Sequence, residues 1–166
     1  MNAYVTIDEN WGFSYKDKPI VSIPAEEKSR TMETAGKVIV YGLKYIPNLL
    51  GKQPVAGCIN VIYTEGVKHN FKPSDKFFFC DTIEDVRKTL EKFPSEDINI
   101  IDNEKLYREF MPMINTVHVT KIDYAYKADA FFENLDKNPD FKIVHDSDEQ
   151  YCFDIVYNFL EYERRK

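Results

Sequence analysis

Three places in this sequence carry polar residues that could bind a ligand or move a proton. Glu26 comes just after Pro24, which suits the first turn of a helix because its missing N–H costs nothing there. The helix dipole also favours a carboxylate at that place, so Glu26 can be explained as an ordinary helix start. Asp102 and Asn103 precede a second predicted helix, where either can cap it, and Thr120 lies in a predicted strand. Residue types alone leave a structural and a chemical role open.

Composition and charge limit the class of protein. The chain has 166 residues, of which 43% are hydrophobic and 14% aromatic, and this predicts one folded domain over residues 1–166. The net charge of −6 argues against a nucleic-acid partner or an anionic membrane surface, because both require a basic face. We find neither an N-terminal targeting segment nor an apolar run long enough to span a bilayer. We therefore expect a cytoplasmic monomer.

The cysteines predict buried thiols. Cys58, Cys80 and Cys152 are odd in number, lack a C-x-x-C spacing and stand beside apolar or aromatic residues. The three histidines form no ligand pattern with them, so we expect no metal site.

The hydrophobic pattern predicts an α/β fold. Strands are expected at residues 3–7, 37–42, 58–63, 76–80, 98–101, 116–124, 141–145 and 151–162. Helices are expected at 24–35, with Gly36 as a C-cap, from the cap Asp81-Thr82 to about Phe93, and at 104–111. Residues 8–23 are expected to form a loop, and residues 129–135 an irregular segment. Strands alternate with helices first and pair as a hairpin at the end. This order predicts a mostly parallel mixed sheet with an antiparallel C-terminal edge, flanked by helices.

The order of residues 8–26 resembles the N-terminal signature of the dihydrofolate reductase family. In that family a strand leads to Asp-Glu-Asn, then Ile-Gly-Tyr-Lys-Gly, then Leu-Pro-Trp-x-Leu-Pro-x-Asp/Glu, whose final acid corresponds to Glu26. A second match is the family's Leu-x-Leu-Thr-x-Ile-Asp, which places its threonine at Thr120. The resemblance reaches the C-terminus and implies the family fold, an eight-stranded mixed sheet flanked by four helices.

The resemblance implies a pterin pocket around Glu26. The family's carboxylate hydrogen-bonds the pterin amino group and ring N–H and favours protonation of the ring, so Glu26 would be the catalytic group, with a pKa raised by burial. The other substrate-binding positions implied are Ala3, Arg30, Leu49, Ile101 and Thr120.

Two of the substrate positions depart from the family pattern. Arg30 stands where the family has an aromatic residue, and Cys58 replaces the arginine that pairs with the folate tail. Loss of that ion pair should cost roughly ten- to a hundredfold in affinity.

The cofactor motifs depart further. The family's Gly-Arg-x-Thr is Gly42-Leu43-Lys44-Tyr45, its Ser-Arg or Ser-Ser is Thr64-Glu65, and the glycine of its Ile-Gly is Ser14. The Gly-Gly pair before the tyrosine-containing helix is Asp102-Asn103, while the tyrosine stays as Tyr107. The phosphate groups of NADPH need cations and close backbone approach, and only Gly42 and Lys44 keep such features.

Two functions of different class follow. In the first, the protein is a divergent dihydrofolate reductase that uses NADPH, as the retention of Glu26 and Tyr107 suggests. In the second, it is a relative with lost or strongly impaired NADPH binding that serves as a non-catalytic binder of a pterin-like small ligand or of a protein partner. The joint loss of the phosphate contacts leads us to expect the second. A reductase with another cofactor is disfavoured because the chain has no G-x-G-x-x-G or P-loop motif.

Overall fold

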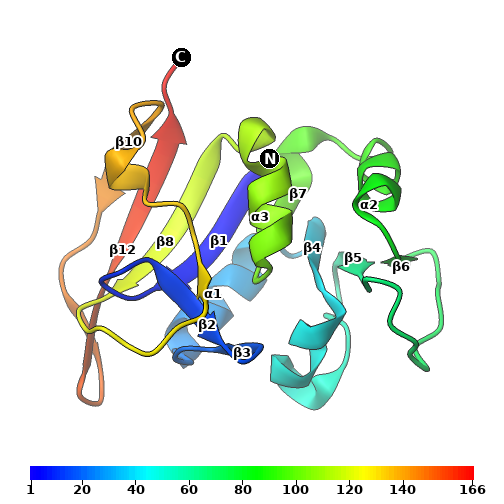
Figure 1. The fold of residues 1–166 in the computed structure, drawn as a ribbon, viewed down its shortest axis with the longest axis horizontal. Helices are drawn as coiled ribbons and strands as arrows, with labels where there is room; N and C mark the ends of the chain where they lie inside the picture. Colours follow the sequence, from blue (N-terminus) through cyan, green and yellow to red (C-terminus); the bar gives the residue numbers. More distant parts are fainter.

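One large mixed sheet runs through the molecule (Figure 1). Its strands are β1 (Asn2–Ile7), β4 (Val38–Gly42), β5 (Ile59–Tyr63), β6 (Phe77–Cys80), β7 (Ile98–Ile101), β8 (Thr116–Ile122), β10 (Phe141–Asp146), β11 (Gln150–Cys152) and β12 (Ile155–Arg164). They follow the order β10-β12-β8-β1-β7-β4-β5-β6, and β11 pairs with β12 beside this path. The computed structural model describes residues 1–166 apart from the side chain of Leu50.

The inner strands of this sheet are parallel, from β8 through β1, β7, β4 and β5 to β6. Only the C-terminal strands β10, β11 and β12 pair antiparallel. The predicted fold class is therefore confirmed. The parallel strands bring their carboxyl ends, among them Gly42, Tyr63 and Ile101, to one edge of the sheet. In open α/β sheets this edge is where ligands bind.

Three α-helices flank the sheet, where the family resemblance implied four. They are α1 (Pro24–Glu33), α2 (Ile83–Leu90) and α3 (Glu104–Phe110). The short 3-10 helices are η1 (Leu43–Asn48), η2 (Leu50–Lys52), η3 (Ser95–Asp97), η4 (Met111–Met113) and η5 (Leu135–Lys137). Of the predicted cap Asp81-Thr82, Thr82 caps α2, since its hydroxyl accepts from the Asp85 N–H. The predicted C-cap at Gly36 is wrong, because α1 ends at Glu33 and Thr34 is its cap.

The two faces of the sheet are covered very differently. In Figure 1, α2 and α3 lie in front of the sheet and α1 lies behind it. The front helices bury apolar side chains such as Val86, Leu106 and Phe110 in the main core. In α1 the single buried residue is Glu26. The helix behind the sheet therefore meets it through polar side chains.

A second, small sheet was not predicted. It consists of β2 (Gly12–Tyr15), β3 (Lys18–Pro19) and β9 (Ala130–Phe131) in the order β3-β2-β9. The loop expected at 8–23 and the irregular segment at 129–135 are wrong to this extent. Strands this short carry no readable alternation, and β2 and β9 pair across a long stretch of chain. This sheet brings residues near 130 to the carboxyl edge of the large sheet.

The single strand expected at 151–162 is also wrong. Phe153 adopts a left-handed φ of 56° and is fully exposed, so the chain turns back there. Cys152 then pairs with Ile155, which makes β11 and β12 a tight hairpin. In the described part of the chain, no helix is long and apolar enough to cross a membrane.

Candidate functional site

A cleft of about 310 Å³ opens at the carboxyl edge of the sheet, between the ends of β4, β5 and β7 and the small sheet. Eight of the nine predicted cofactor positions line it: Ser14, Gly42, Leu43, Lys44, Tyr45, Thr64, Asp102 and Asn103. The ninth, Tyr107, lies just behind it and lines a neighbouring cavity instead. Residues spread over much of the chain thus meet in one place, as the resemblance implied.

Asp102 is the most unusual group in this cleft. Its backbone has a left-handed φ of 42°, which aspartate tolerates better than most residues. Burial raises the pKa of its carboxyl group from 3.8 to about 7, although the nearby Arg30 cation acts in the opposite direction. Among the described residues, no hydrogen bond or ion pair reaches this carboxylate. The floor of the cleft therefore holds a carboxylate that lacks a direct partner.

Asn103 caps α3 and closes the approach to Gly42. Its side-chain oxygen accepts from the Leu106 N–H at 2.9 Å, so the cap predicted for Asp102 or Asn103 belongs to Asn103. A Cβ atom added to Gly42 would lie 2.6 Å from the Asn103 amide nitrogen. The bare backbone at Gly42 is thus covered by the Asn103 side chain.

Tyr107 holds the end of β7 against β1. Its hydroxyl accepts from the Asp102 N–H and donates to the Tyr4 carbonyl oxygen, both at 2.6 Å. The side chain is 3% exposed, and burial raises the pKa of its hydroxyl group well above 10.0. Tyr107 therefore fixes the backbone at Asp102 and stays protonated.

The two lysines of the cleft already face other groups of the protein. Lys44, which the sequence left as a phosphate ligand, pairs with Asp17 at 3.8 Å. The ammonium of Lys105 lies 5.7 Å from the centre of the Tyr63 ring. Both side chains are exposed at the rim.

Glu26 lies in the first turn of α1 and faces Arg30 one turn later. The side chain of Glu26 is 11% exposed, and its Oε1 lies 3.5 Å from Nη1 of Arg30. Burial raises the pKa of Glu26, while the Arg30 cation lowers it. This fits the expected buried carboxylate, but with a cation of the protein beside it.

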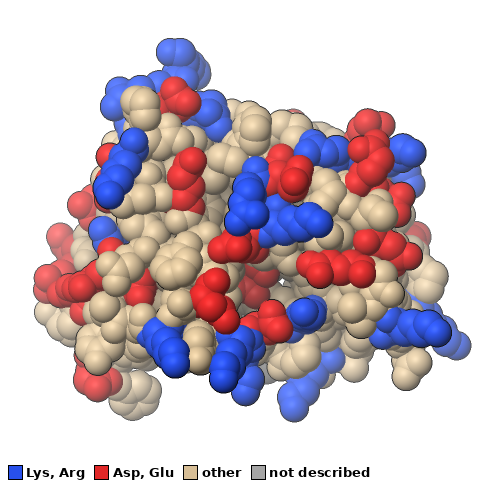
Figure 2. Space-filling view, in the orientation of Figure 1, with Lys and Arg blue, Asp and Glu red and all other residues tan. Residues whose placement is uncertain are grey.

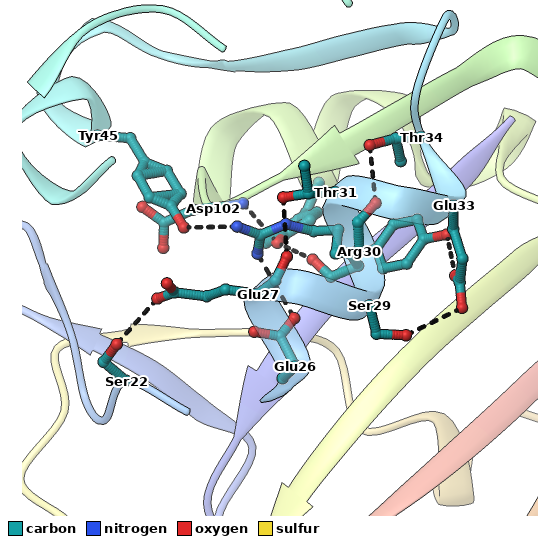
Figure 3. A network of polar contacts seen from close by, with 12 residues as sticks. Ser22, Glu26, Glu27, Ser29, Arg30, Thr31, Glu33, Thr34, Tyr45 and Asp102 are labelled. Carbon is teal, nitrogen blue, oxygen red and sulfur yellow. Dashed lines mark hydrogen bonds and ion pairs between the residues drawn. The ribbon is translucent and has the colours of Figure 1, made fainter. Parts of the chain in front are cut away.

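The Arg30 side chain reaches across the pocket to η1, as Figure 3 shows. Its Nη2 donates to the Tyr45 hydroxyl at 3.3 Å, and Asp102 lies beside the same tyrosine. Burial opposes the charge of Arg30, but Tyr45 and Glu26 outweigh it and raise its pKa. The cavity that Glu26, Arg30, Tyr45 and Asp102 share measures only about 30 Å³. Arg30 thus fills the space beside Glu26 and leaves only this small cavity.

Thr120 lies on the other side of Glu26. Both residues line a cavity of about 330 Å³ between α1 and the strands β8 and β12. In the described chain no hydrogen bond joins their side chains. Tyr4 and His118 stack at 4.4 Å in the same cavity, and burial lowers the pKa of His118. Glu26 and Thr120 therefore face a common space.

The remaining predicted substrate positions lie in two different parts of the structure. Leu49, Ile101 and Arg30 line a cavity of about 400 Å³ on the η1 side of α1. Ala3 does not belong to this site, because it is buried in the core on the α3 face of the sheet. Its neighbour Tyr4 points to the α1 face instead, since side chains alternate along a strand. The structure thus places Ala3 on the opposite face of the sheet from Glu26.

Acidic residues of the cleft were partly missed by the sequence predictions. Asp129 reaches the cleft through β9, and Glu104 through the first turn of α3. Asp17 and Glu65 also line it, and the motif comparison had already placed Glu65 where the family has arginine or serine. The signal for Asp129 was absent from the sequence, because it depends on the pairing of β2 with β9.

Comparisons with known proteins agree with this arrangement. A family model described as dihydrofolate reductase matches residues 1–164, so the chain belongs to the dihydrofolate reductase family. The dihydrofolate reductase of Bacillus subtilis (strain 168) is 24% identical over 137 residues, 80% of this chain and 75% of that protein. That of Staphylococcus haemolyticus is 29% identical over 99 residues, 60% of this chain and 55% of that protein.

A solved structure shares the fold. Dihydrofolate reductase from Enterococcus faecalis, complexed with NADP(H) and RAB-propyl, superposes with a TM-score of 0.78. The two chains are 15% identical, and the superposition covers 99% of this chain and 96% of that one.

Proposed function

We propose that this member of the dihydrofolate reductase family is a non-catalytic binder of a small planar, pterin-like ligand, with lost or strongly impaired NADPH binding. The observation that carries the proposal is Asp102, an acid set into the floor of the cleft where the family docks its cofactor. A phosphate at about 4 Å from an ionised carboxylate is disfavoured by about 4 kcal/mol at an effective dielectric constant of about 20, close to a thousandfold in affinity. Protonation of Asp102 would remove part of this repulsion between the carboxylate and a phosphate.

Other contacts in the cleft support the same proposal. Asn103 covers Gly42, so a phosphate has no bare backbone to approach there. Lys44 is paired with Asp17, and the helix α3 is capped by its own asparagine. The donors that would hold a pyrophosphate are therefore engaged within the protein.

A second candidate is an active, NADPH-dependent dihydrofolate reductase. The comparisons favour it, because both curated relatives carry that name and the Enterococcus faecalis structure holds NADP(H). The retained Glu26 supports it too, since the carboxylate is buried with a raised pKa, as the protonation of a pterin requires. In this function Arg30 would have to swing away from Glu26 when substrate binds.

A turnover assay separates the two functions. NADPH oxidation with dihydrofolate would be followed by absorbance, with the Bacillus subtilis enzyme as positive control and Glu26→Gln as the matched variant. The proposed function predicts no oxidation above background, and no difference between the protein and Glu26→Gln. Turnover that Glu26→Gln abolishes would establish the second candidate.

A further inference from the structure

The acidic cleft at the carboxyl edge of the sheet has the chemistry of a cation site. We propose that it binds an organic cation with two or more ammonium groups, of the aliphatic polyamine class. This inference rests on the proposed function, because it assigns a ligand class to the cleft from which NADPH is excluded.

Carboxylates dominate the lining of the cleft. Figure 2 shows acidic side chains gathered around the hollow in the middle of this face. The acids outnumber the two lysines, Lys44 and Lys105. The five carboxylates belong to Asp17, Glu65, Asp102, Glu104 and Asp129. The low dielectric constant of the surrounding protein focuses the negative field of these carboxylates into the cleft.

Three of these acids already have donors within the protein. Asp17 pairs with Lys44 at 3.8 Å, and Glu104 pairs with Arg108 at 3.2 Å. Asp129 accepts the N–H of Lys16 at 3.1 Å. Their negative charge is therefore partly compensated, and they would serve as weaker contacts for a ligand.

Asp102 and Glu65 are the two acids whose side chains have no donor among the described residues. Asp102 lies at the floor and lines both the cleft and the small cavity beside Arg30. Glu65 stands exposed at the rim. Asp102 is partly buried and lacks a direct partner, which is costly for a carboxylate, and an incoming ammonium group would lower that cost. One ammonium at the floor and a second at the rim fit this pair.

The aromatic wall of the cleft already accepts an ammonium group. Lys105 holds its Nζ over the Tyr63 ring at 5.7 Å, within the usual reach of a cation–π contact. Phe13 and Tyr45 also line the cleft. The protein's own lysine thus demonstrates the type of contact that a ligand ammonium would make.

The spacing of the acids favours an extended organic cation over a metal ion. Within the described chain, no group of three carboxylate, histidine or cysteine side chains is close enough to hold a metal. A divalent ion needs several oxygen ligands at one point. A flexible chain with separated ammonium groups can instead reach carboxylates that lie apart.

Calorimetric titration with spermidine at low salt tests the inference, with NADPH titrated in parallel. We expect spermidine to bind, and Asp102→Asn to weaken binding about tenfold, as the loss of a desolvated charge pair does. Glu65→Gln should weaken it about threefold. Glu84→Gln is the matched control, because it removes one exposed acid of α2 away from the cleft and should leave the affinity within about twofold.

The outcomes distinguish the inference from the proposed function. No spermidine binding at millimolar concentration, together with no NADPH binding, would overturn the inference and leave the proposed function standing. Micromolar NADPH binding would overturn both. Equal weakening by Glu84→Gln and Asp102→Asn would overturn the inference, because it would indicate unspecific attraction to an acidic protein. If Asp102→Asn fails to fold by circular dichroism, Glu65→Gln against Glu84→Gln decides the question.

Discussion

Arg30 of α1 places its guanidinium 3.5 Å from the carboxylate of Glu26, within the site for which we propose a pterin-like ligand. The aminopyrimidine edge of a pterin and a guanidinium are both planar N–H donors, and both can satisfy a buried carboxylate. The protein thus supplies from its own chain a group that resembles part of the ligand. A pterin-like ligand can bind to Glu26 only if the Arg30 guanidinium moves away from it.

Arg30→Met tests how much Glu26 depends on this cation. The variant leaves the buried carboxylate unpaired, so we expect the pKa of Glu26 to rise further. The free energy of unfolding should fall by about 1–3 kcal/mol at pH 8. At pH 5 the loss should be smaller, because a protonated Glu26 needs no cation. Urea unfolding at both pH values measures this, with Lys28→Met, an exposed lysine of the same helix, as control. An equal loss at the two pH values would contradict the pairing.

Arg30→Ala tests whether the side chain blocks the pocket. Removing it would join the cavity of about 30 Å³ to the larger one of about 400 Å³ that it also lines. We expect the affinity for a free pterin, measured by calorimetry, to rise at least about tenfold, because the ligand no longer displaces a guanidinium. A further Glu26→Gln change should remove the gain. Unchanged or weaker pterin binding in Arg30→Ala would show that Arg30 does not occupy the ligand's place.

The pKa of Asp102 predicts a pH-dependent stability. Folded Asp102 keeps its proton up to about pH 7, whereas the unfolded group loses it near pH 3.8. Between these values the folded state binds more protons, so this group's contribution to stability is present at low pH and is lost as the pH rises through about 7.

The Asp102→Asn variant should not show this loss of stability at high pH, because asparagine does not titrate. Its gain over the parent protein should grow from near zero at pH 4 to about 1–3 kcal/mol at pH 8, a range that allows for partial solvent screening. Unfolding curves across this pH range measure the gain. Asp75→Asn, at an exposed loop position, is the control and should show a flat difference. A flat difference for Asp102→Asn as well would mean that this carboxyl group titrates normally.

Tyr107→Phe removes one hydroxyl that holds two strands together. The Asp102 N–H and the Tyr4 carbonyl would each lose a partner at 2.6 Å inside the fold. We expect a loss of about 1–3 kcal/mol in unfolding free energy. Tyr151→Phe, at an exposed tyrosine, should change it by less than about 0.5 kcal/mol. A similar small effect of both substitutions would rule out the bridging role of Tyr107.

Local patterns predicted much of the large sheet. The β-branched run of β4 reads as a buried strand because both of its faces are covered, and Thr82 and Asn103 cap helices by purely local hydrogen bonds. The small sheet escaped prediction because its strands form only through pairing between segments far apart in sequence. The turn at Phe153 lacks the glycine or asparagine that usually marks such a position.

The sequence predicted the site where its residues belong to motifs. It did not predict the directions of side chains or the contacts between separate elements. Nearly all of the cofactor positions came together in one cleft, because all of those in it except Ser14 lie at or just after the end of a parallel strand. The placement of Ala3 at the site failed because the resemblance did not show which face of the strand its side chain occupies. The direction of the Arg30 side chain depends on its hydrogen bond to Tyr45, which comes from another element.

Direct titration with NADPH by calorimetry at low salt is the measurement that tests the central claim. Our account predicts no binding up to millimolar cofactor, and measurable binding once Asp102→Gly and Asn103→Gly are combined, because the acid and the cover over Gly42 are then removed together. The Enterococcus faecalis enzyme, whose structure holds NADP(H), serves as the positive control. A dissociation constant in the micromolar range or tighter for the unchanged protein would contradict the account and identify an active cofactor site.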